Sequence, residues 1–276
     1  MSEKAKKYSF EEMIIQCCKS DEFKLRKWIK KVLTRSGFSI QEDNYESDRR
    51  GQYSGIHNLL AIRGKNAKVC LVAHTDVCRD HRGGPSIAPE PVIKVDEFGG
   101  KRIIQDKTCK TQVGGDDRLG VAINMWIALN TGYDMGMLFT TDEEVGIVSA
   151  QRVRFPELME FELLCQVDRG RHSRQIVTNI GGLELCNEEV AEKLIKISEE
   201  MGIPRYQISG LITDVYAIRR NKMCKQAINL TCGYYSAENR DEWICIEEAR
   251  DTVKFVSSII QKYDIGEVLI AEKLCA

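Results

Sequence analysis

An unbroken apolar run constrains the fold of this chain more than any other feature of its sequence. Residues 68–73 read Lys-Val-Cys-Leu-Val-Ala, and the run ends abruptly in the polar residues His74, Thr75 and Asp76. Such a run is typical of a central strand that is covered on both faces of a sheet. In open α/β sheets ligands collect at the carboxyl ends of these strands, so we expect His74 and Asp76 to border a binding site.

Other apolar runs also lead into acidic residues: residues 135–139 into Glu143 and Glu144, residues 161–167 into Asp168, and residues 227–232 into Glu238. A fifth acid, Asp116, lies in a glycine-rich turn before an expected helix. Burying an unpaired charge costs several kcal/mol or more, so these carboxylates must face water, a cation or a substrate. Taken singly, the Glu143-Glu144 pair is also compatible with an ordinary acidic turn, and His74 with a core histidine.

Hydrophobic spacing and turn residues predict the remaining elements. We expect two N-terminal helices, the second of which ends at Gly37. Further helices are expected through residues 121–128, 188–201 and 247–263. Strands are expected at 38–42, 57–63 and 176–180, and residues 92–95 and 102–104 are expected to form a hairpin. Alternation of strands and helices in one chain of 276 residues is compatible with a single large α/β domain.

Composition excludes several classes of protein. The chain is 43% apolar and 29% charged, as is usual for a soluble globular protein, and its net charge of -1 argues against nucleic-acid or anionic-membrane partners. A polar N-terminus and the lack of any long apolar run favour a cytoplasmic location. The 11 cysteines are scattered without a C-x-x-C pair, which predicts reduced thiols and neither disulfides nor a zinc finger.

The chemistry of these side chains favours a metal centre. One histidine with several carboxylates suits zinc, manganese or cobalt, and too many acids converge for a single tetrahedral zinc. Two ions that share a carboxylate would neutralise the acids and activate a bridging water for hydrolysis. Asp76 lies on the same side of its strand as His74 and is expected to orient the imidazole. Glu143 and Glu144 point in different directions, so one can hold a metal while the other transfers protons.

In this order, the motifs resemble those of a known superfamily. His74-Thr75-Asp76, Gly114-Gly115-Asp116-Asp117, residues 142–146 (Asp-Glu-Glu-Val-Gly) and Val167-Asp168 are similar to the signatures of the co-catalytic dinuclear zinc peptidases. That group includes peptidase T, glutamyl and leucyl aminopeptidases, carboxypeptidase-like enzymes and acyl-amino-acid deacylases. The resemblance extends from about residue 68 to the C-terminus. It implies a phosphorylase/hydrolase-like, three-layer α/β/α fold with a mixed, mostly parallel central sheet.

Site roles also follow from this resemblance. It makes His74 and Asp168 ligands of one metal ion, Asp116 the bridging ligand, and Glu144 a ligand of the second ion. Asp76 would orient His74, and Glu143 would be the general base that activates the metal-bridging water. The resemblance further implies a cis peptide bond between Asp116 and Asp117.

The expected second metal site departs from the family pattern. Relatives close this site with a histidine, whereas the corresponding stretch here offers Glu238, and none of the four histidines follows His172. A carboxylate ligand adds negative charge, which favours harder ions such as manganese over zinc. His172, in the loop after Asp168, is an alternative ligand. Cys78 lies near His74, but the sequence shows no partners with which it could bind a soft metal.

The spacing between motifs leaves no room for the lid domain of many relatives. We therefore expect residues 1–276 to form one lidless catalytic domain, with N-terminal helices in 1–37 and a hairpin insertion in 77–113 at the rim of the cleft. His81 and the turn of residues 82–85 belong to that rim. Residues 48–50 and 169–174 are charge clusters typical of solvated loops, although an arginine there could bind a substrate carboxylate. Tyr234 and Tyr235 are expected to pack.

Together these features predict a dimetal-dependent hydrolase of peptide or amide bonds, most simply an aminopeptidase. An N-acyl-amino-acid deacylase or a carboxypeptidase is the alternative within the superfamily, and a metal-poor, non-catalytic binding or assembly module is the alternative outside catalysis. The expected partners are a peptide or acyl-amino-acid substrate, with neither nucleic acid nor membrane. The sequence leaves the oligomeric state open, including a homo-oligomer.

Overall fold

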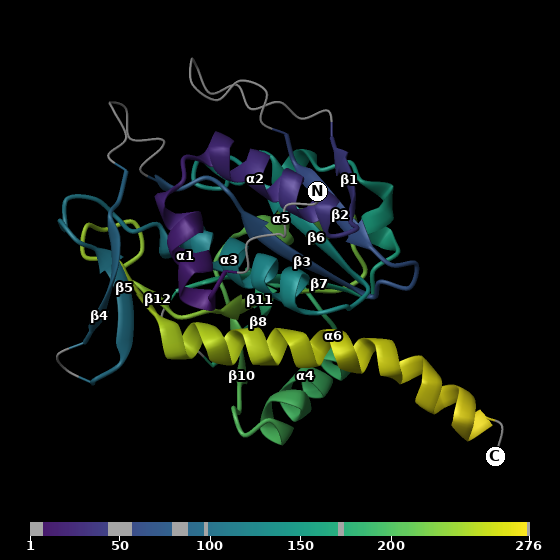
Figure 1. Cartoon of the computed structure of the whole chain (residues 1–276). Helices are drawn as coiled ribbons and strands as arrows, with labels where there is room; N and C mark the ends of the chain where they lie inside the picture. Colours follow the sequence, from purple (N-terminus) through teal and green to yellow (C-terminus); the bar gives the residue numbers. More distant parts are fainter. Residues whose placement is uncertain (1–7, 44–56, 79–87, 97–98, 171–173, 275–276) are drawn as a thin grey trace, which may run out of the picture.

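Within residues 8–43, 57–78, 88–96, 99–170 and 174–274, which the computed structural model describes, a nine-stranded mixed sheet occupies the centre of the fold. Its strands run in the order β1-β2-β6-β3-β7-β11-β8-β10, with β9 paired to β8 (Figure 1). Their bounds are β1 Ser39–Glu42, β2 Leu59–Arg63, β3 Val69–His74, β6 Met135–Thr140, β7 Leu163–Arg169, β8 Gln175–Ile180, β9 Leu183–Glu184, β10 Tyr206–Ser209 and β11 Ala227–Thr231. Side chains are described as far as Tyr263.

The centre of this sheet is parallel. Strands β6, β3, β7 and β11 run in one direction, and β2 and β8 pair antiparallel to the outer two of them. The carboxyl ends of the four parallel strands therefore meet at one edge, where His74 pairs in register with Thr140. The mixed sheet of an α/β fold was predicted, and it is present. The polar residues that follow the strands lie at the ends of its parallel strands.

Side chains of β3 alternate between two apolar cores. Val69, Leu71 and Ala73 belong to one core, and Cys70 and Val72 belong to the other. Every residue of β3 and of β6 is buried. This burial confirms that the unbroken apolar run forms a strand covered on both faces.

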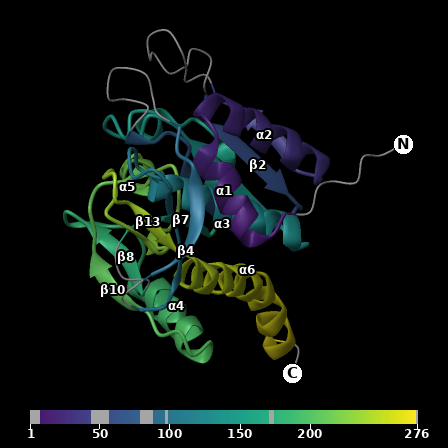
Figure 2. The same ribbon diagram turned by 60° about the vertical axis from the view of Figure 1, so that its left-hand side comes forward.

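Helices and short helical turns cover the two faces of the sheet. One core takes side chains from α1 (Phe10–Lys19), α2 (Glu22–Arg35), α3 (Gly115–Asn130), α4 (Glu188–Glu200) and α6 (Ile246–Leu274); the other takes them from α5 (Asp214–Arg220), η2 (Ala150–Arg152) and η3 (Pro156–Met159). The views in Figures 1 and 2 show α6 alongside α4, and α6 also contacts α3. The result is the predicted three-layer arrangement. No helix in the described ranges combines the length and apolar composition that crossing a bilayer requires.

Local sequence accounts for the start of the N-terminal helices. Ser9 and Glu12 form a reciprocal capping box at α1, and the Asp21 side chain accepts a hydrogen bond from the backbone of Lys24 at the start of α2. These contacts satisfy backbone N–H groups that a helix cannot pair internally. Elements that were not predicted include β9, β10, α5, η2 and η3, and α6 extends beyond the expected end at residue 263 to Leu274.

A second, four-stranded sheet lies beside the first in the described part of the chain. The predicted hairpin forms as β4 (Pro91–Val95) and β5 (Arg102–Asp106), and it is extended by β13 (Trp243–Cys245) and β12 (Tyr234–Tyr235) in the order β12-β13-β5-β4. The sequence predicted the hairpin but not its pairing with the segment after β11. This pairing holds the loop between β12 and β13, with Glu238 and Glu242, close to the start of α3.

Candidate metal centre

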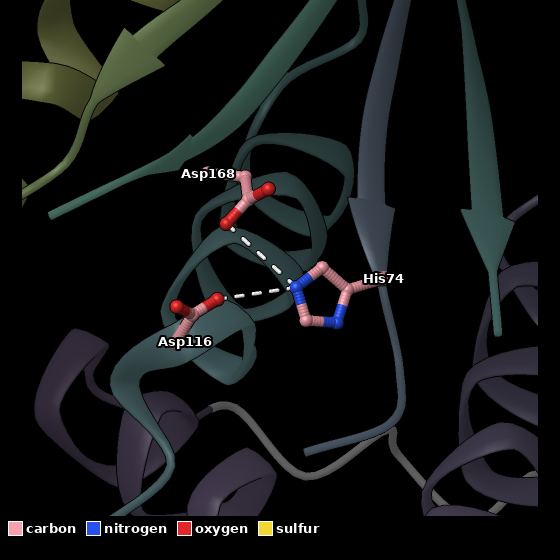
Figure 3. Close-up of side chains that lie close together, drawn as sticks. All are labelled: His74, Asp116 and Asp168. Atoms are coloured by element: carbon pink, nitrogen blue, oxygen red, sulfur yellow. Dashed lines mark hydrogen bonds and ion pairs between the residues drawn. The ribbon is translucent and has the colours of Figure 1, made fainter. Parts of the chain in front are cut away.

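Three predicted ligands meet at the carboxyl edge of the parallel strands. His74 ends β3, Asp168 lies near the end of β7, and Asp116 lies in the first turn of α3. The Nε2 atom of His74 is 3.1 Å from Asp116 Oδ1 and 3.7 Å from Asp168 Oδ1. Figure 3 shows both carboxylates facing the same ring nitrogen. The three side chains therefore form one cluster, although they come from segments far apart in the sequence.

Asp76 connects the His74 ring to the acidic pair. The Nδ1 atom of His74 lies 3.1 Å from the backbone oxygen of Asp76 and 3.4 Å from its Oδ1. The same carboxylate accepts hydrogen bonds from the backbone N–H groups of Glu143 at 3.3 Å and Glu144 at 3.2 Å. Because Asp76 contacts Nδ1 of His74, the Nε2 atom of the ring is directed at Asp116 and Asp168. Asp76 therefore lies where a residue that orients a histidine ligand is expected.

The loop at the start of α3 is held from two sides. The peptide bond between Asp116 and Asp117 is cis, as the resemblance implied. Asp117 is buried, and its carboxylate accepts hydrogen bonds from the backbone N–H groups of His74 at 3.2 Å and Gly120 at 3.1 Å. A Cβ atom at Gly120 would lie 2.3 Å from Asp117 Oδ1, so only glycine allows this approach. Asp117 thereby ties β3 to α3.

Glu242 holds the loop from its other side. It is fully buried, and its carboxylate accepts hydrogen bonds from the backbone N–H groups of Gly114 at 2.5 Å and Asp116 at 3.2 Å. Burial, followed by the charge of Asp116, raises the pKa of Glu242 to about 8. Sequence reasoning missed this residue. No local pattern pointed to it, since the contact joins two segments that are 126 positions apart.

Side chains around Asp168 orient its carboxylate. Its Oδ2 atom accepts hydrogen bonds from Thr213 Oγ1 at 2.8 Å and from Gln166 Nε2 at 2.9 Å. The hydroxyl of Tyr234 donates to Oδ1 at 3.3 Å. Tyr234 packs as predicted, being only 3% exposed, and it also contacts the site. Thr213 immediately precedes α5, a helix that was not predicted, so its contribution could not be foreseen.

The other predicted metal ligands form a second cluster with a residue that had been set aside. Ligand atoms of Cys78, Glu144 and Glu238 lie within 4.8 Å of one another. The backbone N–H of Cys78 donates to Glu144 Oε1 at 2.9 Å, and its thiol lies 3.5 Å from Glu238 Oε2. The sequence showed no partners for Cys78, and the structure places two carboxylates beside it. These neighbours come from segments after β6 and β12 that only the tertiary fold brings together.

Carboxylates of both clusters line one pocket. A cavity of about 510 Å³ is lined by Asp116, Glu143, Glu144, Asp168 and Glu238, and its lining also includes Leu211, Ile212 and Tyr234. Glu143, predicted as the general base, thus lines the same pocket as four of the predicted ligands. The pocket is large enough for a small ligand of the kind that enzyme clefts hold.

Burial makes the acidic side chains of this pocket hard to ionise. Burial and the charge of Asp168 raise the pKa of Asp116 to about 6, and burial and the charge of Asp116 raise that of Glu144 to about 9. The pKa of Glu143 is also well above its ordinary value, because of burial first. Burial disfavours protonated His74, but Asp168, Asp116 and Asp76 outweigh it and raise the pKa of the imidazole. So dense a cluster of acids is stabilised best by cations.

The first cluster also fits the dimensions of a metal site. Metal–nitrogen and metal–oxygen bonds of about 2.1 Å place tetrahedral ligands about 3.4 Å apart. The separations of 3.1 and 3.7 Å from His74 Nε2 to the two aspartates lie on either side of this value. A nitrogen and two carboxylate oxygens suit zinc, manganese or cobalt, so the residues present fit the expected ion.

Several predicted residues lie outside the described part of the chain. These are the alternative ligand His172, the cleft-rim residues His81 and 82–85, and the charge cluster at residues 48–50. Arg169, from the second charge cluster, lines the pocket.

Comparisons with known proteins give matches only at the level of structure. No model of a protein family and no curated protein matches the sequence. The aminopeptidase PepT from Bacillus cereus is 15% identical, with a TM-score of 0.71 over 92% of this chain and 98% of that one. A tripeptidase from Staphylococcus aureus is 13% identical, with a TM-score of 0.71 over 91% and 96%.

A third similar structure is the TET1 peptidase from Pyrococcus horikoshii. It is 14% identical, with a TM-score of 0.65 over 91% of this chain and 99% of that one. At such identities the likeness establishes the fold. The chain therefore has the α/β fold of these peptidases, which is the fold that the resemblance of its motifs to the dinuclear zinc peptidases predicted.

Proposed function

We propose that the chain is a dimetal-dependent hydrolase of peptide or amide bonds, most simply an aminopeptidase. The observation that carries this proposal is the presence of two three-donor clusters whose carboxylates line a single pocket. The named activities of the similar structures, an aminopeptidase, a tripeptidase and a further peptidase, support it.

Each predicted ligand has a place in this proposal. His74 and Asp168 would hold one ion, Asp116 would be shared between the two, and Glu144 and Glu238 would hold the second ion. Zinc is the expected metal, with manganese and cobalt as alternatives. When bound, such ions supply Lewis acidity and lower the pKa of water.

Two acidic residues complete the proposed chemistry. Glu143 lines the pocket, and the hydrogen bond from its backbone N–H to Asp76 holds it at the end of β6. From there its carboxylate takes a proton from the attacking water and delivers it to the leaving amine. Asp76 acts indirectly, by orienting His74. We also propose that residues 1–276 work as one catalytic domain without a separate lid and with residues 77–113 at the cleft rim.

The test begins with the metal content of the purified protein, measured by mass spectrometry after chelation and reloading with zinc, manganese or cobalt. We expect two ions per chain and cleavage of aminoacyl anilides that carry a free amino group. Preference for N-acyl amino acids, or release of C-terminal residues, would instead identify the deacylase or carboxypeptidase. A protein that binds no ion under any of these conditions would be a metal-poor, non-catalytic relative.

Assembly is a separate part of the proposal. The TET1 peptidase of P. horikoshii assembles into a tetrahedron or an octahedral shell. A homo-oligomer is therefore the assembly to test for this chain, by size-exclusion chromatography with light scattering.

A further inference from the structure

Cys78 lies beside Glu144 and Glu238, the two residues proposed to hold the second metal ion together with the bridging Asp116. Its cluster combines donors from three segments: Cys78 follows β3, Glu144 follows β6 and Glu238 follows β12. The resemblance to zinc peptidases predicted a histidine at this site, and the chain has none after His172. The Cys78 thiol is nevertheless present there as a sulfur donor, beside the two carboxylates.

The spacing of this cluster matches a metal site that includes sulfur. A metal–sulfur bond of about 2.3 Å and a metal–oxygen bond of about 2.1 Å place tetrahedral sulfur and oxygen ligands about 3.6 Å apart. Cys78 Sγ lies 3.5 Å from Glu238 Oε2. The bond from the Cys78 backbone N–H to Glu144 Oε1, at 2.9 Å, fixes the position of the cysteine and engages only one oxygen of that carboxylate.

We propose that Cys78 is a thiolate ligand of the second ion and takes the place of the expected histidine. This inference rests on the proposed dimetal function. On binding, the S–H bond breaks, a sulfur–metal bond forms and the proton passes to solvent. In the absence of metal, the thiol instead donates a hydrogen bond to Glu238.

A sulfur ligand changes the expected choice of metal. Glu238 alone favoured harder ions such as manganese, whereas thiolate ligands select softer ions such as zinc, and cobalt also binds more tightly than manganese. The second site should therefore bind zinc or cobalt in preference to manganese. The soft sulfur ligand distinguishes the second site from the first, whose candidate ligands are a histidine nitrogen and two carboxylate oxygens.

Cobalt spectroscopy provides a test that does not depend on activity. The full-length apoprotein is titrated with Co²⁺, while bound cobalt is counted by mass spectrometry. We expect a near-ultraviolet thiolate-to-cobalt charge-transfer band that accompanies one of the two ions. The variant Cys78→Ser should lose the band and bind the second ion roughly tenfold or more weakly. Cys109→Ser is the matched control, because Cys109 is an exposed thiol that belongs to neither three-donor cluster of the described residues.

Alkylation of the wild-type protein gives a second readout that requires no variant to fold. Iodoacetamide modification of the Cys78 peptide, followed by mass spectrometry, should slow when zinc is bound. Modification of the Cys109 peptide should not change. Protection of Cys78 by zinc and not by manganese would support the sulfur ligand.

The outcomes separate this inference from the proposed function. Two bound cobalt ions without a charge-transfer band, or a band that survives in Cys78→Ser, would overturn the thiolate ligand and leave the dimetal centre intact. Equal alkylation of Cys78 with and without zinc, in protein shown to hold two ions, would do the same. Failure to bind any ion would overturn both.

Discussion

The carboxylate of Glu242 accepts a hydrogen bond from the backbone N–H of Asp116 at 3.2 Å, and so holds in place the residue on which both proposed metal positions depend. The same carboxylate accepts the N–H of Gly114 at 2.5 Å. Glu242 is fully buried. It is a positioning residue, since its carboxylate binds the backbone that presents the bridging side chain.

Replacement of Glu242 should therefore weaken metal binding without removing a ligand. We expect Glu242→Ala to lower metal affinity by roughly 10–100-fold. Loss of the acceptor leaves buried N–H groups unpaired, at a cost of about 1–3 kcal/mol in the free energy of unfolding. Calorimetric metal titration of the folded variant measures the first effect and urea unfolding the second. Glu184→Gln, an exposed control, should change neither, and unchanged metal affinity in Glu242→Ala would refute the positioning role.

Glu143 and Glu144 should respond differently to the same substitution. Glu143→Gln removes the proposed general base, so kcat should fall by about 10²–10⁴-fold while two ions remain bound. Glu144→Gln removes a proposed ligand, so occupancy of the second ion should fall as well. Metal content and steady-state kinetics measured on the same samples distinguish the two. If Glu143→Gln lost an ion, the division of roles between these neighbours would be wrong.

The metal-free protein should lose stability as pH rises. The pKa values of Asp116 and Glu144, about 6 and about 9 in the folded protein, exceed the ordinary values of 3.8 and 4.5. The folded state therefore binds more protons than the unfolded state between these limits, and the free energy of unfolding must decrease with pH there. The contribution of protonated Asp116 and Glu144 to the free energy of unfolding is complete below their ordinary pKa values. It is lost as pH passes through about 6 for Asp116 and about 9 for Glu144.

Urea unfolding in the presence of a chelator, at about pH 5.5 and about pH 8.5, measures this dependence. The double variant Asp116→Asn/Glu144→Gln should reduce this dependence, and Glu242, whose pKa is about 8, should account for part of what remains. Zinc should raise the melting temperature more at the higher pH, because the ions bind the deprotonated ligands. A metal-free protein that is more stable at the higher pH would contradict the assignment.

The pocket rim predicts a preference for apolar substrates. Leu211 and Ile212 line the pocket yet are 79% and 59% exposed, so both leave apolar surface in water. We expect Leu211→Ser and Ile212→Ser to raise KM for substrates with an apolar side chain by roughly tenfold, with little change in kcat. Val95→Ser is the control, because Val95 is 66% exposed and is not among the described residues that line the pocket. Equal effects on apolar and polar substrates would exclude a role in specificity.

Sequence patterns predicted those helices and strands whose formation depends on residues that are close together in the sequence. The unbroken run before His74 predicted a central strand covered on both faces, and the runs before Glu143 and Asp168 were also predicted as strands; all three form. Parallel strands align their carboxyl ends, so polar residues placed there had to meet. For this reason the convergence of His74 and Asp168 was predictable, and the ordered motifs placed Asp116 beside them.

Only the tertiary structure decided which side chains support this site. Glu242 reaches Asp116 across 126 positions, and Cys78 reaches Glu238 across 160. Neither contact has a local signature, because each depends on how the second sheet packs against the first. Strand character, caps and turns are properties of neighbouring residues and can be inferred from sequence, whereas the partner of a buried carboxylate or thiol is set by the packing of distant segments.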